Sequence, residues 1–235
     1  MPAGERIYAI GDVHGCFDLL FKLTRAILAD VKQRPVAQSR IVVLGDFIDR
    51  GPDSAKVVEV LTTLRKDERV VVLKGNHETA LVEGIRGNRS ALEAWIDFGG
   101  DATLRSFGAR DDDIWPADTR RLVDGVRRII PDSLIDWLDG LPLSYSAGPY
   151  LFVHAGVRPG VALHSQDPDD LVWIRSEFTN STADHGAIIV HGHTISEHVS
   201  VLPNRIGVDT GAYRTGRLSA IALDASGHRI IEVTR

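Results

Sequence analysis

Five short stretches of this chain place metal-binding or phosphate-binding side chains directly after an apolar run. They are GDVHG at 11–15, GDFIDRG at 45–51, GNHE at 75–78, HAG at 154–156 and HGHT at 191–194. A buried strand that ends in such a stretch delivers polar side chains to the carboxyl end of a sheet. Five of them in succession predict one charged site at a sheet edge.

The apolar runs around these stretches predict an α/β chain. Runs at 7–10, 41–44 and 70–73 alternate with helical patterns at 17–31 and 57–64, the second of them capped by Asp53. Strand–helix–strand order with continuously apolar strands predicts parallel pairing and right-handed crossovers. Further strands are expected at 150–153, 187–190, 205–208, 218–223 and 229–233, and the close spacing of the last three predicts antiparallel pairing.

The pattern changes between residues 78 and 140, where apolar residues recur at helical intervals. We expect a mostly helical insertion within a single domain that spans 1–235. Trp95, Trp115 and Trp137 fall in this insertion, and we expect them to pack its helices rather than stack on a ligand.

Composition restricts the classes of function. The chain is 43% hydrophobic and 25% charged with a net charge of −5, so no basic surface for nucleic acid is expected. No apolar run is long enough to span a membrane. Cys16 is the only cysteine, which excludes an intrachain disulfide and fits a reducing compartment, so we expect a cytoplasmic protein. The oligomeric state stays open.

The polar side chains of the five stretches are carboxylate, imidazole and amide groups with no thiolate. This donor set suits Mn²⁺, Fe or Zn²⁺, and it exceeds the needs of one ion. Two ions ~3.5–4 Å apart with a shared carboxylate would form a hydrolytic site. Arg50 and Arg175 add forked donors that match phosphate. The combination predicts hydrolysis of phosphate esters.

These motifs, in this order, resemble the phosphoprotein phosphatase family of calcineurin-like metallophosphoesterases, and most of all its bacterial and phage-type members. The resemblance covers about residues 6–213 and includes segments 95–104, 171–175 and 208–212. It implies a calcineurin-like metallophosphoesterase fold, a β-sandwich flanked by helices. It also implies hydrolysis by direct attack of a hydroxide that bridges two metal ions, for which Mn²⁺ is preferred and Fe or Zn are alternatives.

The resemblance also implies a role for each matching residue. One metal would be held by Asp12, His14 and Asp46, and the other by Asp46, Asn76, His154 and His193. His77 would be the general acid, oriented by Asp49. Arg50 and Arg175 would hold the phosphate.

Several alternatives stay open. The main hypothesis is a serine/threonine protein phosphatase, which the Asp49–Arg50 pair and Glu78 favour. The alternative is a diadenosine tetraphosphatase or another nucleotide pyrophosphohydrolase, with Tyr213 as the candidate for adenine stacking. A non-catalytic scaffold is the third reading. Arg175 could instead pair with Asp169 or Asp170, and His191 could support the site or be tied to backbone.

Overall fold

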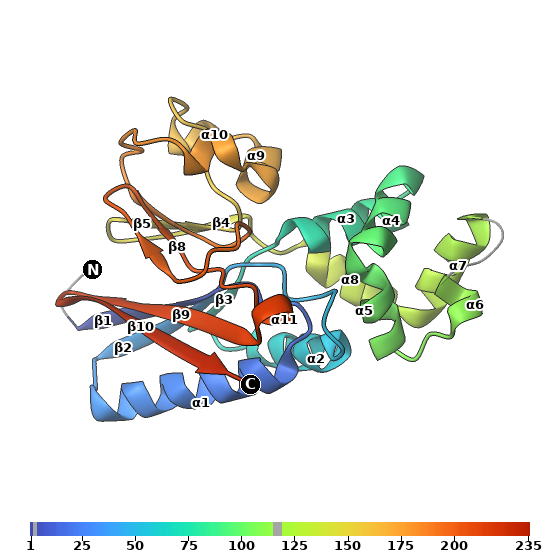
Figure 1. Ribbon diagram of the computed structural model, residues 1–235, viewed down its shortest axis with the longest axis horizontal. Helices are drawn as coiled ribbons and strands as arrows, with labels where there is room; N and C mark the ends of the chain where they lie inside the picture. The colour runs from blue at the N-terminus through green and yellow to red at the C-terminus, as the bar shows by residue number, and fades with distance from the viewer. Residues whose placement is uncertain (2–3, 115–118) are drawn as a thin grey trace.

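The computed structural model describes residues 1, 4–114 and 119–235, and Figure 1 shows their arrangement. The strands are β1 (Glu5–Ile10), β2 (Gln38–Val43), β3 (Val70–Val72), β4 (Ser144–Ala147), β5 (Tyr150–Val153), β6 (Ile188–His191), β7 (Ser200–Val201), β8 (Arg205–Gly207), β9 (Arg217–Asp224) and β10 (Gly227–Thr234). They form two sheets, with the orders β10-β9-β1-β2-β3 and β4-β5-β6-β8-β7.

The two sheets pack face to face through apolar side chains that alternate along their strands. In β1, Ile7 and Ala9 point into the layer between the sheets, where they join Phe152 and Val190 of the second sheet. Side chains on a strand alternate between faces, so Tyr8 points to the other side of the sheet. This inter-sheet layer confirms the predicted β-sandwich.

Helices cover both outer faces of the sandwich (Figure 1). Helices α1 (Phe17–Gln33) and α2 (Ser54–Leu64) pack on the first sheet, and α9 (Pro168–Trp173) and α10 (Ser176–Thr179) on the second. The predicted helix at 17–31 is therefore confirmed. Asp53 occupies the N-cap position of α2 as expected, but its side chain makes no capping hydrogen bond and accepts one from Lys56 instead. Two short helices, η2 (Leu163–Ser165) and α11 (Ala212–Thr215), lie in connections.

The predicted helical insertion is confirmed and lies to one side of the sandwich (Figure 1). Trp95 is fully buried there, whereas Trp137 is partly buried with its ring 5.6 Å from that of Phe47. Trp115 falls outside the described residues. The helices are α3 (Asn76–Ile85), α4 (Arg89–Trp95), the π-type turn η1 (Ile96–Gly100), α5 (Asp101–Ser106), α6 (Asp111–Ile114), α7 (Thr119–Ile129) and α8 (Asp132–Asp139).

One prediction about strand pairing was wrong. β9 and β10 form the expected antiparallel hairpin, but β8 belongs to the other sheet. It pairs parallel with β6 and antiparallel with β7, a two-residue strand that the apolar pattern did not reveal. Close spacing in sequence misled the prediction because the chain crosses from one sheet to the other between β8 and β9.

Both sheets send the carboxyl ends of three parallel strands toward a common set of loops. These strands are β1, β2 and β3 in one sheet and β5, β6 and β8 in the other. All five ligand-rich stretches follow one of them. Among the described residues, no helix combines the length and the apolar character needed to cross a bilayer.

Candidate metal centre

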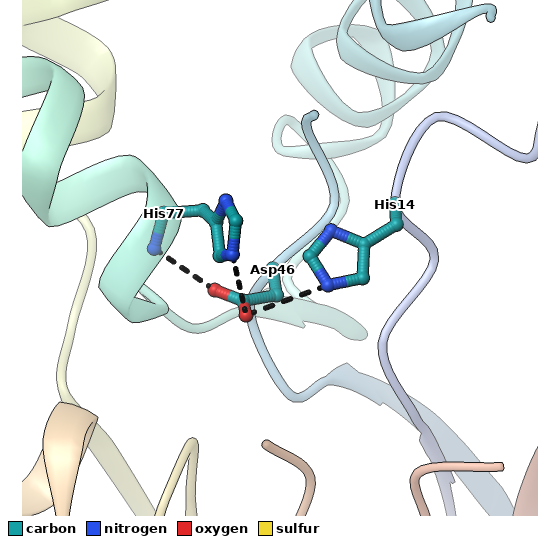
Figure 2. Close-up of side chains that lie close together, drawn as sticks. All are labelled: His14, Asp46 and His77. Atoms are coloured by element: carbon teal, nitrogen blue, oxygen red, sulfur yellow. Dashed lines mark hydrogen bonds and ion pairs between the residues drawn. The ribbon is translucent and has the colours of Figure 1, made fainter. Parts of the chain in front are cut away.

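The loops at the carboxyl ends bring metal-binding side chains into two groups that share Asp46. His14, Asp46 and His77 form one group, and Asp46, His154 and His193 form the other. The ligand atoms within each group lie within 4.8 Å of one another, and all five residues are buried. Figure 2 shows Asp46 between His14 and His77, with Oδ2 3.7 Å from Nε2 of His14. A carboxylate shared by two groups is the arrangement expected for paired ions.

Backbone carbonyls orient two of the imidazoles. His14 Nδ1 lies 2.8 Å from the carbonyl oxygen of Ile48, and His154 Nδ1 lies 2.9 Å from that of Leu44. A carbonyl only accepts hydrogen bonds, so Nδ1 is the donor in both rings. In the neutral ring this leaves the Nε2 lone pair facing Asp46, which is the usual way a second partner orients a metal-binding histidine.

Several acceptor atoms converge around His154 Nε2. Asn76 Oδ1 lies 3.0 Å away, His193 Nδ1 3.2 Å away and Asp46 Oδ2 3.4 Å away. His193 also has a buried Nε2 without a hydrogen-bond partner in the described structure. Burial and then the neighbouring His154 lower the pKa of His193 to about 2, so its ring is neutral. These lone pairs fit a bound cation, which would satisfy them together.

Charge balance points the same way. Burial, reinforced by the nearby Asp209 and Asp46, raises the pKa of Asp12 well above its usual value. Burial would lower the pKa of His154, but the charge of Asp46 raises it, so a positive charge is favoured between these groups. Buried carboxylates of like charge are costly unless a cation compensates them.

Asp12 lies outside both ligand groups, although the resemblance assigns it to the first metal. Its carboxylate accepts the backbone N–H of His193, at 3.0 Å from Oδ2, and lines the same cavity as Asp46. His77 instead belongs to the first group. The assignment of Asp12 to a metal therefore stays a prediction.

His77 and Asp49 form the pair that the resemblance implied. His77 Nδ1 donates to Asp49 Oδ2 at 2.7 Å, which leaves Nε2 directed to the site at 3.9 Å from Asp46 Oδ2. Burial alone would lower the pKa of His77, but the charges of Asp46 and Asp49 raise it. A proton on this ring is therefore stabilised.

The two arginines line the same cavity of about 350 Å³. Arg50 has Nη1 3.1 Å from His14 Nε2, and its guanidinium carbon lies 4.6 Å from the centre of the Tyr213 ring. Arg175 has no ion pair with Asp170, because Arg158 holds that carboxylate through two hydrogen bonds of 2.6 Å. The alternative pairing of Arg175 with Asp169 or Asp170 is therefore wrong, since neither carboxylate forms an ion pair with Arg175 in the described structure.

The backbone of the site is unusual. In the part of the chain that the structure describes, the non-glycine residues with positive φ are His14, Asp46, Asp49, Arg50 and His193. Each is a predicted site residue. Such conformations cost about 1–3 kcal/mol each and persist only where surrounding contacts enforce them. Gly75 allows one close approach, since a Cβ there would lie 2.2 Å from Asp46 Oδ1.

His191 is tied to the backbone rather than to the ligand groups. Its Nδ1 lies 3.0 Å from the carbonyl oxygen of Gly192, and its ring packs edge-on against Phe178. Burial lowers the pKa of His191 to about 4, so the ring is neutral. The preference for His193 over its neighbour agrees with this geometry.

Three buried residues near the site carry roles that sequence reasoning missed. Asp209 is buried close enough to Asp12 to raise the pKa of that carboxyl group beyond the effect of burial. It follows β8 just as the predicted ligands follow their strands, so its position in the sequence could have identified it as a residue of the site. Trp95 and Thr103 both donate hydrogen bonds to Asp49. They come from segment 95–104 of the helical insertion, which carries part of the family resemblance but was given no role at the site.

Comparison with known proteins agrees with this geometry. A family model described as calcineurin-like phosphoesterase matches residues 5–226. Serine/threonine-protein phosphatase 1 of Salmonella typhimurium is 34% identical over 223 residues, which cover 92% of this chain and 90% of that protein. A symmetrical bis(5'-nucleosyl)-tetraphosphatase of a Janthinobacterium species is 34% identical over 154 residues. That match covers 65% of this chain and only 44% of the relative.

A solved structure supports the fold. The crystal structure of a suggested diadenosine tetraphosphatase superposes with a TM-score of 0.67 at 23% identity, covering 97% of this chain and 93% of that one. The resemblance to phosphoprotein phosphatases is confirmed by the Salmonella relative together with the family model. The chain therefore belongs to the calcineurin-like phosphoesterase family and is a metal-dependent phosphoesterase.

Proposed function

We propose that this chain is a phosphomonoesterase that removes phosphate from phosphoserine and phosphothreonine residues of proteins. The observation that carries the proposal is the pair of buried ligand groups that share Asp46 beside the His77–Asp49 pair. The Salmonella relative, which is named a serine/threonine phosphatase, aligns over nearly the full length of both chains. We propose Mn²⁺ as the physiological ion, with Fe or Zn as alternatives, because the donors are carboxylate, imidazole and amide oxygen.

We propose a task for each residue of the ligand groups and the cavity. Two bound ions would supply a hydroxide nucleophile near neutral pH and offset phosphate charge. The residues that would hold them are Asp12, His14, Asp46, Asn76, His154 and His193. Arg50 and Arg175 bind the phosphate oxygens, which they reach from the cavity wall. His77 donates the proton from Nε2 to the leaving oxygen while Asp49 holds Nδ1.

The nucleotide reading has one structural observation in its favour. Tyr213 lines the cavity and offers an aromatic ring near the site. The guanidinium of Arg50 already lies over that ring, and His14 meets it edge-on with ring centres 5.1 Å apart. With Arg50 over the ring and His14 at its edge, less of Tyr213 is free to stack on adenine. The protein phosphatase reading is therefore preferred.

The proposal also covers the cellular location of the enzyme and its domain organisation. A chain with one cysteine fits a reducing cytoplasm, and we propose that location. We also propose that the sandwich and its helical insertion act as one domain, because Trp95 and Thr103 of the insertion contact Asp49 of the site.

A substrate panel tests the proposed function. The Mn²⁺-loaded chain is given a mixture of phosphoserine and phosphothreonine peptides, and separately diadenosine tetraphosphate. We expect kcat/KM to be at least about ten-fold higher for the peptides, a difference of about 1.4 kcal/mol in transition-state stabilisation. The reverse preference would establish the nucleotide reading. Asp46→Asn serves as the control and should be inactive on both substrates.

A further inference from the structure

The carboxylate of Asp49 is completely buried and receives three side-chain hydrogen bonds. His77 Nδ1 and Trp95 Nε1 both donate to Oδ2 at 2.7 Å, and Thr103 Oγ1 donates to Oδ1 at 2.6 Å. Two of these three donors lie further along the helical insertion, Trp95 at the end of α4 and Thr103 in α5, whereas His77 stands at the start of α3. Helices α4 and α5 therefore contact the buried carboxylate that also binds His77.

The donors constrain the carboxylate in different directions. One oxygen is shared between an imidazole and an indole N–H, and the other is held by a hydroxyl. Thr103 Oγ1 also accepts the backbone N–H of Asp49 at 2.8 Å, which fixes the residue at its left-handed φ of 73°. Both the plane and the position of the carboxylate are thus determined by residues other than His77.

Trp95 is itself held in place. Its side chain is 0% exposed, and Gly100 packs against it so closely that a Cβ there would lie 2.5 Å from Cδ2 of the indole. The adjoining Gly99 has φ of 109°, and its carbonyl oxygen accepts the backbone N–H of Arg50 at 3.0 Å. The segment 95–103 therefore contacts both Asp49 and Arg50.

We propose that Trp95 and Thr103 are positioning residues for the proton-transfer step. By fixing the Asp49 carboxylate, they hold the His77 ring so that Nε2 faces the leaving oxygen. As the hydroxide nucleophile bonds to phosphorus and the P–O bond to the leaving group breaks, the proton on His77 Nε2 moves to that oxygen, and Asp49 keeps its charge. The inference rests on the acid role of His77 in the proposed function.

Leaving-group dependence is the readout that a purely structural role would not change. General acid catalysis matters for phenyl phosphate, whose leaving phenolate is basic, and little for 2,4-dinitrophenyl phosphate, whose phenolate needs no proton. Trp95→Phe keeps an aromatic ring in the buried site but removes the indole N–H together with part of the ring volume, and the control Trp137→Phe makes the same loss of volume elsewhere. We expect kcat for phenyl phosphate to fall about 10–100-fold with KM unchanged. A loss of this size is typical when a residue that orients an active-site side chain through a hydrogen bond is removed. We expect kcat for 2,4-dinitrophenyl phosphate to stay within about two-fold.

A matched control and a reference variant separate the outcomes. Trp137→Phe makes the same change at another tryptophan of the insertion and should affect neither substrate. His77→Asn should show the leaving-group-dependent loss in full, and if it does not, the acid role in the proposed function fails. If His77→Asn shows the loss and Trp95→Phe does not, or if Trp95→Phe lowers kcat equally for both substrates, the positioning role is overturned.

Variants at Thr103 give a second test that does not depend on the folding of Trp95→Phe. Thr103→Val removes the hydroxyl at nearly constant volume, whereas Thr103→Ser keeps it. We expect the selective loss on phenyl phosphate in Thr103→Val and its recovery in Thr103→Ser. Equal activities of the two variants on phenyl phosphate would contradict the proposal.

Discussion

The carboxyl group of Glu78 accepts the backbone N–H of Asp46 at 2.9 Å, so a buried side chain holds the loop that carries the shared ligand. The same carboxyl group accepts the N–H groups of Phe47 at 3.0 Å, Ile48 at 3.2 Å and Gly75 at 2.8 Å. Four backbone N–H groups thus donate to the Glu78 side chain. These hydrogen bonds offset the unfavourable backbone conformation of Asp46, whose φ is 46°. Glu78 therefore shapes the loop that carries Asp46 while belonging to neither ligand group.

Removing this carboxyl group should destabilise the fold and the site together. Glu78→Ala leaves four buried N–H donors without a partner, and each such donor costs about 1–3 kcal/mol, so we expect the free energy of unfolding to fall by about 4 kcal/mol or more. Urea unfolding of the metal-free chain measures the change. Glu83→Ala, at an exposed position of the same helix α3, should leave stability nearly unchanged. A loss equally small at Glu78 would contradict the role of its hydrogen bonds.

Metal removal should abolish activity, because the bound ions would supply the hydroxide nucleophile near neutral pH, which the side chains of the cavity do not generate by themselves. We expect chelation to inactivate the chain toward p-nitrophenyl phosphate and Mn²⁺ to restore it. Elemental analysis should find about two ions per chain in the native protein and about one in His193→Ala. His191→Gln is the control, since His191 is tied to backbone, and should keep both ions. Loss of an ion in the control alone would reverse the assignment.

Removing the forked donor of Arg50 should weaken both binding and turnover. Hydrogen bonds to charged groups contribute about 1.5–3 kcal/mol, so Arg50→Ala should lower kcat/KM about 10–150-fold, with KM raised and kcat reduced. Arg175→Ala should act in the same direction because it lines the same cavity. Arg158→Ala is the matched control, since Arg158 binds Asp170 outside the cavity. Unchanged steady-state kinetics in Arg50→Ala would remove that residue from the phosphate site.

Acid should weaken a buried ion pair that lies away from the site. Arg6 donates to Asp224 at 2.8 Å with both side chains less than a tenth exposed, and removing one partner of such a pair costs about 3–5 kcal/mol. The Ser226 hydroxyl, followed by Arg6, holds the pKa of Asp224 below its ordinary value. The folded state then binds fewer protons than the unfolded state, so this stability is present above the ordinary carboxyl pKa and is lost as pH falls through the folded one.

We therefore expect Asp224→Ala to be about 3 kcal/mol less stable than the native chain near pH 7, with the difference shrinking below about pH 4. Thermal unfolding followed by circular dichroism across this range measures it. Asp67→Ala, which removes an exposed partner of Arg69, should change stability little at any pH. A constant difference for Asp224→Ala down to low pH would contradict the assignment.

Much of the site was predictable from local sequence. Asp12, Asp46, Asn76, His154 and His193 each follow an apolar run, and the structure places all five where parallel strands end. The helical insertion could also be predicted, because the spacing of apolar residues that indicates a helix is visible in a short stretch of sequence. Strand pairing within the second sheet was harder to predict, since β6 and β8 are brought side by side by contacts that neither strand specifies alone.

The sequence by itself determined which chemical groups are available, in what order they occur and that each stands at the end of a strand. Only the tertiary structure decided how they meet. The left-handed conformations of His14 and Asp46 are enforced by distant contacts rather than by residue type. Trp95 reaches Asp49 across 46 residues of chain. Hydrogen bonds of this kind depend on the folded positions of both partners, and no local pattern of side chains encodes that distance.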